Sequence, residues 1–197
     1  MKNIKISESF LFQVIAISMV VFGMISCTNN RMDDSKEVAE EHNDQKFDNN
    51  QEKEKDAQFL VNAAEIYLAE IQLGQFAQNN GAEPSVKKMG KMVESDHAKS
   101  FNDLKELALK KSITIPTSLT EEGKDAYKDL SNKSGEEFDK EYCDKMVAGH
   151  KKAIEKFENA STESEDADIK AWAASSLPVL RSHLDHALTC QNILEKK

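Results

Sequence analysis

The chain has 197 residues, a formal net charge of −9, and only seven glycines and three prolines. This length fits one domain with appended segments, and the scarcity of glycine and proline argues against a turn-rich β-sandwich. The negative charge argues against a nucleic-acid partner, because the phosphate backbone attracts basic protein surfaces and repels acidic ones.

The N-terminal segment is typical of a secretory signal. A short basic start precedes a mostly apolar run over residues 10–25, which is shorter than the roughly 20 residues of a membrane-spanning helix. The run closes at Cys27 with a pattern that resembles the lipobox of bacterial lipoproteins. We therefore expect residues 1–26 to form a lipoprotein signal peptide and Cys27 to be lipidated. The alternative is an ordinary signal peptide with an incidental cysteine.

The location follows from the same segment. Thr28 follows Cys27, the candidate lipidation site. In this respect the chain resembles outer-membrane lipoproteins, because lipoproteins that stay at the inner membrane carry Asp at this position. This indicates an outer-membrane lipoprotein of the bacterial cell envelope, facing the periplasm or the cell surface. The lipid would make the membrane a partner of the protein.

Residues 27–55 are predicted to be a disordered tether. The segment consists mostly of Asn, Asp, Glu, Lys and Gln, with three large apolar residues, Met32, Val38 and Phe47. So few apolar side chains cannot offset the entropy lost when a chain becomes ordered.

From Asp56 onward the apolar residues recur at the spacing of a helix. Gly81 and Pro84 indicate where one helix ends and the next begins. The predicted helices are four long ones, at about 56–79, 84–111, 135–160 and 165–195, and a short one at about 120–131. The sequence therefore predicts an all-α domain over residues 56–197. Its fold would be a four-helix bundle whose two hairpins are joined by a long connection that contains the short helix.

Each long helix carries one polar residue in the middle of its apolar stripe: Glu70, His97, His150 and His183. Buried polar groups must be paired or bound to a metal. One carboxylate and three imidazoles suit a transition metal such as iron, copper or zinc. Candidates to flank these ligands are Glu94, Asp96, Met146 and His186. The alternative is a buried hydrogen-bond network that fixes the register of the helices.

Two cysteines lie at matching distances from this polar layer. Cys143 comes seven residues before His150, and Cys190 comes seven residues after His183. Because the last two helices form an antiparallel hairpin, the cysteines are level if the histidines are level. An exported protein can keep a disulfide between them. The alternative is a pair of buried, reduced thiols. Counting from the predicted turn, however, places His150 and His183 at different heights.

Five segments are similar to a bacterial family known as domain of unknown function 4142, often described as a predicted outer membrane protein. They are Glu70–Ala77, Met92–His97, Phe138–Tyr142, Met146–His150 and Leu177–His183. The resemblance covers about residues 57–195 and implies a ferritin-like bundle with a long middle crossover. It implies no reaction, because the activity of the family is not established. A di-iron centre would need a glutamate where this chain has Leu180.

Three functions are compatible with these features. The first is a lipid-anchored envelope domain without catalysis, which binds another protein or supports the envelope. The second is a metal-binding protein that uses the Glu/His cluster. The third, least favoured, is a redox or hydrolytic enzyme built on that cluster. No phosphate-binding loop, nucleophile elbow or Cys-x-x-Cys motif is present to assign catalytic residues.

Overall fold

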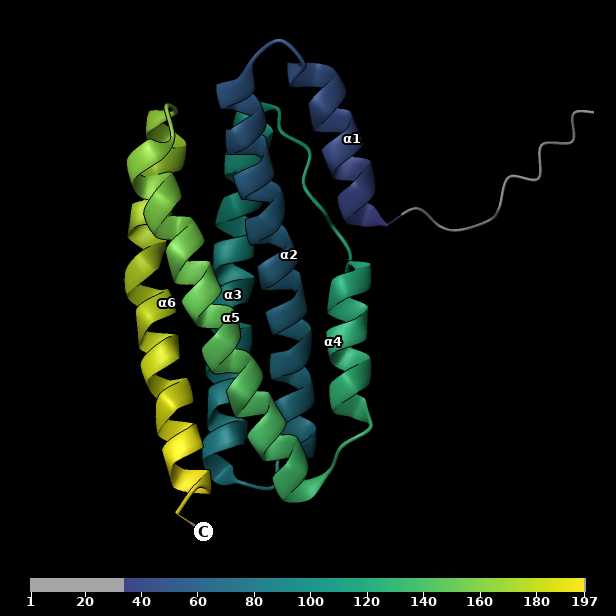
Figure 1. Ribbon diagram of the computed structural model, residues 1–197, viewed down its shortest axis with the longest axis vertical. Coiled ribbons are helices and arrows are strands. Elements are labelled where there is room, and N and C mark those ends of the chain that lie inside the picture. Colours follow the sequence, from purple (N-terminus) through teal and green to yellow (C-terminus); the bar gives the residue numbers. More distant parts are fainter. Residues whose placement is uncertain (1–33, 197) are drawn as a thin grey trace, which may run out of the picture. The chain divides into compact units, whose positions relative to one another are not determined.

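The computed structural model describes residues 34–196 (Figure 1). The predicted signal peptide and Cys27 lie outside the described residues. Within residues 34–196 the chain forms six α-helices and no β-strand. The helices are α1 (Ser35–Phe47), α2 (Gln51–Asn80), α3 (Pro84–Lys111), α4 (Glu121–Ser131), α5 (Gly135–Glu163) and α6 (Ala167–Leu194).

Four long helices form a bundle of two hairpins, α2–α3 and α5–α6 (Figure 1). α2 packs against α5, and α3 packs against α6. The chain between α3 and α4 is extended, and α4 lies beside α2. The prediction of an all-α helical bundle is confirmed. None of the described helices combines the length and the apolarity that a membrane span requires.

The hydrophobic core consists of two clusters that lie on either side of the polar layer. One cluster includes Leu60, Tyr67, Leu104, Phe157 and Leu180. The other includes Leu73, Val93, Phe138, Met146 and Ala187. Along each long helix, the predicted Glu or His stands between members of the two clusters. The fold therefore brackets the polar layer with apolar contacts, which keep water away from its histidines.

α2 and α3 approach most closely where two glycines face each other. A Cβ atom added at Gly90 would lie 2.6 Å from the carbonyl oxygen of Gly74, and one added at Gly74 would lie 2.7 Å from that of Gly90. No larger residue fits this crossing without moving a helix. The contact lies one turn from Glu70 on α2, so it fixes the separation of the two helices near the polar layer.

The prediction of a disordered tether over residues 27–55 is wrong from Ser35 onward, because α1 and the first turn of α2 occupy this region. Only Ala39 and Phe47 are buried apolar residues of α1. The helix is held mainly by polar contacts to distant parts of the chain. Asn43 donates a hydrogen bond to the carbonyl of Thr114 and accepts one from its N–H, at 2.7 and 2.8 Å.

Asp34, the N-cap residue of α1, binds the starts of two helices. The carboxylate of Asp34 accepts a hydrogen bond from the N–H of Lys36 at 2.7 Å and another from the N–H of Glu121 at the start of α4. The ammonium group of Lys36 lies 2.6 Å from Glu65 of α2. A composition-based prediction misses such a helix, because its stability depends on partners that are remote in sequence.

Candidate metal centre

One side chain from each long helix meets in the middle of the bundle: Glu70 of α2, His97 of α3, His150 of α5 and His183 of α6. The ring centroids of the three histidines lie 4.9 to 5.6 Å apart. Their ligand nitrogens all lie within 4.8 Å of one another. The histidines are at most 1% exposed, and Glu70 is 6% exposed.

The carboxylate of Glu70 joins two of the histidines. Its Oε2 atom lies 2.7 Å from Nε2 of His97 and 3.5 Å from Nε2 of His150. The rings of His150 and His183 have centroids 5.2 Å apart, so these two residues are level. The predicted height difference is wrong, because α5 continues to Glu163 and the turn lies later in the chain than the sequence indicated.

In the rings of His150 and His183, one nitrogen forms a hydrogen bond away from the cluster, which determines the nitrogen that keeps a free lone pair. Nδ1 of His150 lies 2.9 Å from the carbonyl oxygen of Met146, and Nε2 of His183 lies 3.0 Å from Oδ2 of Asp96. Because these oxygens can only accept, each of the two ring nitrogens carries the proton. The opposite nitrogens, Nε2 of His150 and Nδ1 of His183, therefore keep free lone pairs. Metal-binding histidines have this arrangement.

The inward-facing atoms of the cluster have no hydrogen-bond partner. Oε2 of Glu70, Nε2 of His97, Nε2 of His150 and Nδ1 of His183 are all buried and unsatisfied. The 2.7 Å contact between Glu70 and His97 does not have the geometry of a hydrogen bond. Each unsatisfied buried group costs about 1–3 kcal/mol. A buried polar network formed by these residues alone would leave Nε2 of His150 and Nδ1 of His183 without hydrogen-bond partners.

The charges at the centre suit a cation. Burial raises the pKa of Glu70, but the imidazoles of His150, His97 and His183 outweigh it and lower the pKa to about 2. Burial also lowers the pKa of His183 to about 4, with a further contribution from His97, against the hydrogen bond to Asp96. At neutral pH, Glu70 is therefore anionic and His183 is neutral. These are the states in which the two residues can bind a metal.

The depressed pKa of His183 predicts a loss of stability in acid. In the unfolded chain this imidazole takes up a proton near its ordinary pKa of 6.5, whereas in the folded protein it does so only near pH 4. As pH falls through this window, the free energy of unfolding of metal-free protein should fall, by up to about 3 kcal/mol from this residue. Urea titrations at pH 7 and pH 4.5 measure the change.

The matched variants for this measurement lie on the same helix. His183→Gln should lose less stability than the wild type between the two pH values, because it has no imidazole to protonate. His186→Gln removes an exposed imidazole of α6 and should behave like the wild type. Equal losses in the wild type and His183→Gln would contradict the assignment of His183 as a buried neutral imidazole.

The structure places only two of the four predicted flanking residues beside the cluster. Asp96 is hydrogen-bonded to His183, and the carbonyl group of Met146 is hydrogen-bonded to His150. Glu94 instead accepts hydrogen bonds at the surface from Gln75 and Gln78. His186 is exposed on α6. The prediction that Glu94 and His186 flank the cluster is therefore wrong.

The two cysteines are free and buried in this structure, so the predicted disulfide is not formed. They are nevertheless neighbours, as the level histidines require, because their thiols share a hydrogen bond. That bond lowers the pKa of the Cys190 thiol and raises that of Cys143. Of the two alternatives that the sequence left open, the structure has the reduced pair.

Sequence reasoning missed a groove that reaches the cluster from the side of α2, α4 and α5. The groove has a volume of about 560 Å³ and is lined by Glu70 and Gly149, among others. A Cβ atom at residue 149 would lie 3.0 Å from Oε1 of Glu70. The available signal was a glycine directly before His150, in the interior of a predicted helix, where glycine often marks a close approach.

A comparison with curated proteins and a comparison with solved structures each found no match. A comparison with protein families matched residues 41–189 to a domain of unknown function, DUF4142. The match begins in α1, ends in α6 and contains all four residues of the cluster. The chain therefore belongs to the DUF4142 family.

Proposed function

We propose that this protein binds one transition-metal ion through Glu70, His97, His150 and His183. The observation that carries the proposal is that one inward-facing atom of each residue is buried without a hydrogen-bond partner. The ligand nitrogens of the three histidines lie within 4.8 Å of one another, and Oε2 of Glu70 faces His97 and His150 at 2.7 and 3.5 Å. A single cation would satisfy all four atoms. Without a cation, each atom stays buried without a partner, which costs about 1–3 kcal/mol of folding free energy.

The ligand set favours a borderline ion such as zinc, iron or copper. Imidazole binds all three, and one carboxylate adds a negative charge without selecting a hard ion such as calcium. An ion bonded at about 2.1 Å to each nitrogen holds its ligands roughly 3 to 4 Å apart. The ligand nitrogens of the three rings lie within 4.8 Å of one another, close to that range. Leu180 is buried one turn from His183, where a second ion would need a carboxylate.

The test is the metal content of the purified protein, measured by mass spectrometry before and after incubation with Zn²⁺, Fe²⁺ or Cu²⁺. We expect one ion per wild-type chain and none in His97→Ala, because the variant loses a ligand from the centre of the cluster. His186→Ala removes an exposed imidazole and should retain the ion. A wild-type protein that contains no metal and takes up none of the three ions would contradict the proposal.

We also propose that the domain is a ferritin-like bundle held at the outer membrane by a lipid on Cys27. Two hairpins joined by a long connection, with candidate ligands from all four helices, support the ferritin-like arrangement. The apolar run before Cys27 supports the anchor. The anchor predicts that the mature protein partitions into a detergent phase and that Cys27→Ser leaves the precursor uncleaved or the protein soluble. Wild-type protein in the aqueous phase would contradict it.

In that setting the protein would act by holding the ion at the envelope rather than by catalysis. The bundle buries the three histidines almost completely, which suits retention of a metal more than rapid turnover of a large substrate. A role in binding another envelope protein is the second proposal, and it is supported only by the predicted location. The metal measurement above separates the two.

A further inference from the structure

The groove beside the cluster has the size of a small-molecule site. Its volume of about 560 Å³ lies within the range of 300–1,000 Å³ that is usual for ligand pockets. Small residues of the facing helices, including Ala69 of α2 and Gly149 of α5, line part of it. Of the four residues of the cluster, Glu70 alone lines the groove.

Glu70 connects the groove to the candidate metal centre. Its Oε2 atom faces His97 at 2.7 Å, and its Oε1 atom lies on the side of Gly149. Because residue 149 has no side chain, the backbone of α5 can approach this carboxylate oxygen closely, and both residues line the groove. Any other residue would place a Cβ atom 3.0 Å from Oε1. The lack of a side chain here gives a ligand in the groove a route toward the ion.

The charge of the groove is opposite to the charge of the protein. The chain carries −9 overall, yet four lysines and three glutamates line the groove. Lys36 is paired with Glu65 at 2.6 Å, and Lys145 lies 3.4 Å from Glu141. Lys152 has no ion-pair partner within residues 34–196. Its charge is therefore available to a ligand.

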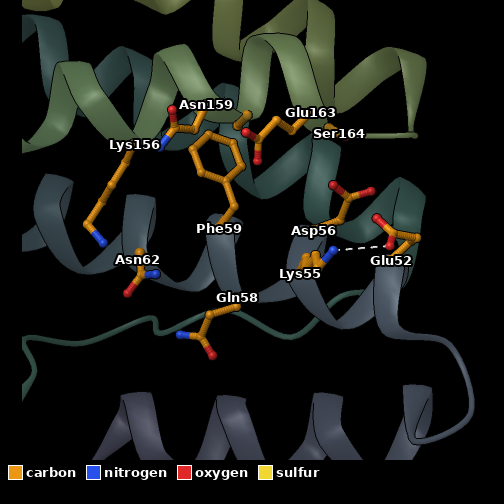
Figure 2. A pocket seen from close by; sticks show the side chains of 11 residues that line it. Glu52, Lys55, Asp56, Gln58, Phe59, Asn62, Lys156, Asn159, Glu163 and Ser164 are labelled. Atoms are coloured by element: carbon orange, nitrogen blue, oxygen red, sulfur yellow. Dashed lines mark hydrogen bonds and ion pairs between the residues drawn. The ribbon is translucent and has the colours of Figure 1, made fainter.

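Lys156 extends the same cationic edge by one turn of α5. It lines both this groove and a neighbouring pocket of about 330 Å³ along the α2–α5 seam. Figure 2 shows its side chain reaching from α5 toward Asn62 of α2. Like Lys152, it has no ion-pair partner among the described residues. Two free ammonium groups on one edge of a concave site favour a small anion over a cation.

We propose that this groove binds a small organic anion, with a carboxylate or phosphate oxygen that reaches the metal ion beside Glu70. The inference rests on the proposed metal site, because the bare Glu70 carboxylate would repel the anion. A bound cation removes that repulsion and offers a coordination position. Metal and anion therefore strengthen each other's binding, and the coupling must be equal in both directions. Lys152 and Lys156 hold the remaining negative charge.

The experiment uses the protein loaded with Co²⁺, whose visible absorption changes when an anion enters its coordination shell. Succinate and inorganic phosphate, titrated separately, are the probes, and their comparison identifies the preferred oxygen donor. We expect at least one probe to change the Co²⁺ spectrum of the wild type. In calorimetry, its dissociation constant should be at least tenfold larger without Co²⁺.

Three variants locate the anion. Lys152→Glu should weaken probe binding at least tenfold and leave Co²⁺ affinity within threefold of the wild type. Lys151→Glu is the matched control, because it makes the same charge change at an exposed position of α5 that does not line the groove. Gly149→Leu should abolish the spectral change by filling the route to Glu70. If this variant does not fold, the two lysine variants decide the question.

The outcomes separate this inference from the proposed function. A wild-type protein that takes up no Co²⁺ overturns both. Uptake of Co²⁺ without binding of either probe overturns the anion site alone. Probe binding that is equal in Lys152→Glu and Lys151→Glu, or equal with and without Co²⁺, also overturns the anion site, since the groove and the metal would then play no part in it.

Discussion

Replacing Gly90 with alanine should destabilise the protein by about 2 kcal/mol, although alanine is the better helix former by about 1 kcal/mol. The added methyl group would lie 2.6 Å from the carbonyl oxygen of Gly74 and 2.9 Å from Cβ of Ala77. Both contacts are with rigid parts of α2, so the helices must separate. Overpacking of this kind typically costs 1–3 kcal/mol, which is a large share of the 5–15 kcal/mol of a typical domain.

Urea denaturation of metal-free protein measures the effect of Gly90→Ala. Ser95→Ala on the exposed side of α3 is the control, because it makes a helix-favouring change without touching α2. It should be neutral or slightly stabilising. If Gly90→Ala were also stabilising, the close crossing of α2 and α3 would not exist in solution.

Replacing His150 with alanine should remove the stabilisation that a metal confers on the wild type. An ion that binds only the folded state, at a free concentration 100 times its dissociation constant, raises the free energy of unfolding by about 2.7 kcal/mol. Loss of one of four ligands should weaken metal binding by at least 100-fold. At the same metal concentration, the ion would then add almost nothing to the free energy of unfolding of the variant. Thermal unfolding with and without Zn²⁺ shows the difference directly.

The metal-free forms provide the internal control for His150→Ala. In the wild type, Nε2 of His150 is buried without a partner, so removal of the ring relieves a cost while it opens a cavity. We expect these two effects to oppose each other and the metal-free variant to remain folded. A rise with Zn²⁺ that is as large in the variant as in the wild type would show that the ion binds elsewhere.

Most of the bundle could be predicted from the sequence, because apolar periodicity and helix punctuation act locally. Pro84 at the first position of α3 fixes that boundary, and the predicted helix at 84–111 agrees with the structure. The same periodicity identified Glu70, His97, His150 and His183, since a polar residue in the middle of an apolar stripe must point inward. The structure brings these four residues together.

The remaining features depend on contacts between distant residues, which no local pattern encodes. α1 is held by Asn43 and Asp34 through hydrogen bonds to residues more than 70 positions away. The groove is lined by residues of α1, α2, α4 and α5, and the sequence indicates it only through Gly149. The prediction for Glu94 depended on its position three residues before His97, which does not fix where the carboxylate points, and Gln75 and Gln78 bind that carboxylate at the surface.

The origin of the cluster from four helices has a consequence for the kinetics of folding. Each hairpin supplies two of its residues, Glu70 and His97 from α2–α3, and His150 and His183 from α5–α6. The hairpins are local structures that can form early, whereas their docking requires contacts remote in sequence. The complete site exists only after docking. A bound ion would therefore leave the folding rate nearly unchanged and lower the unfolding rate. The folded state would live longer, but it would not form faster.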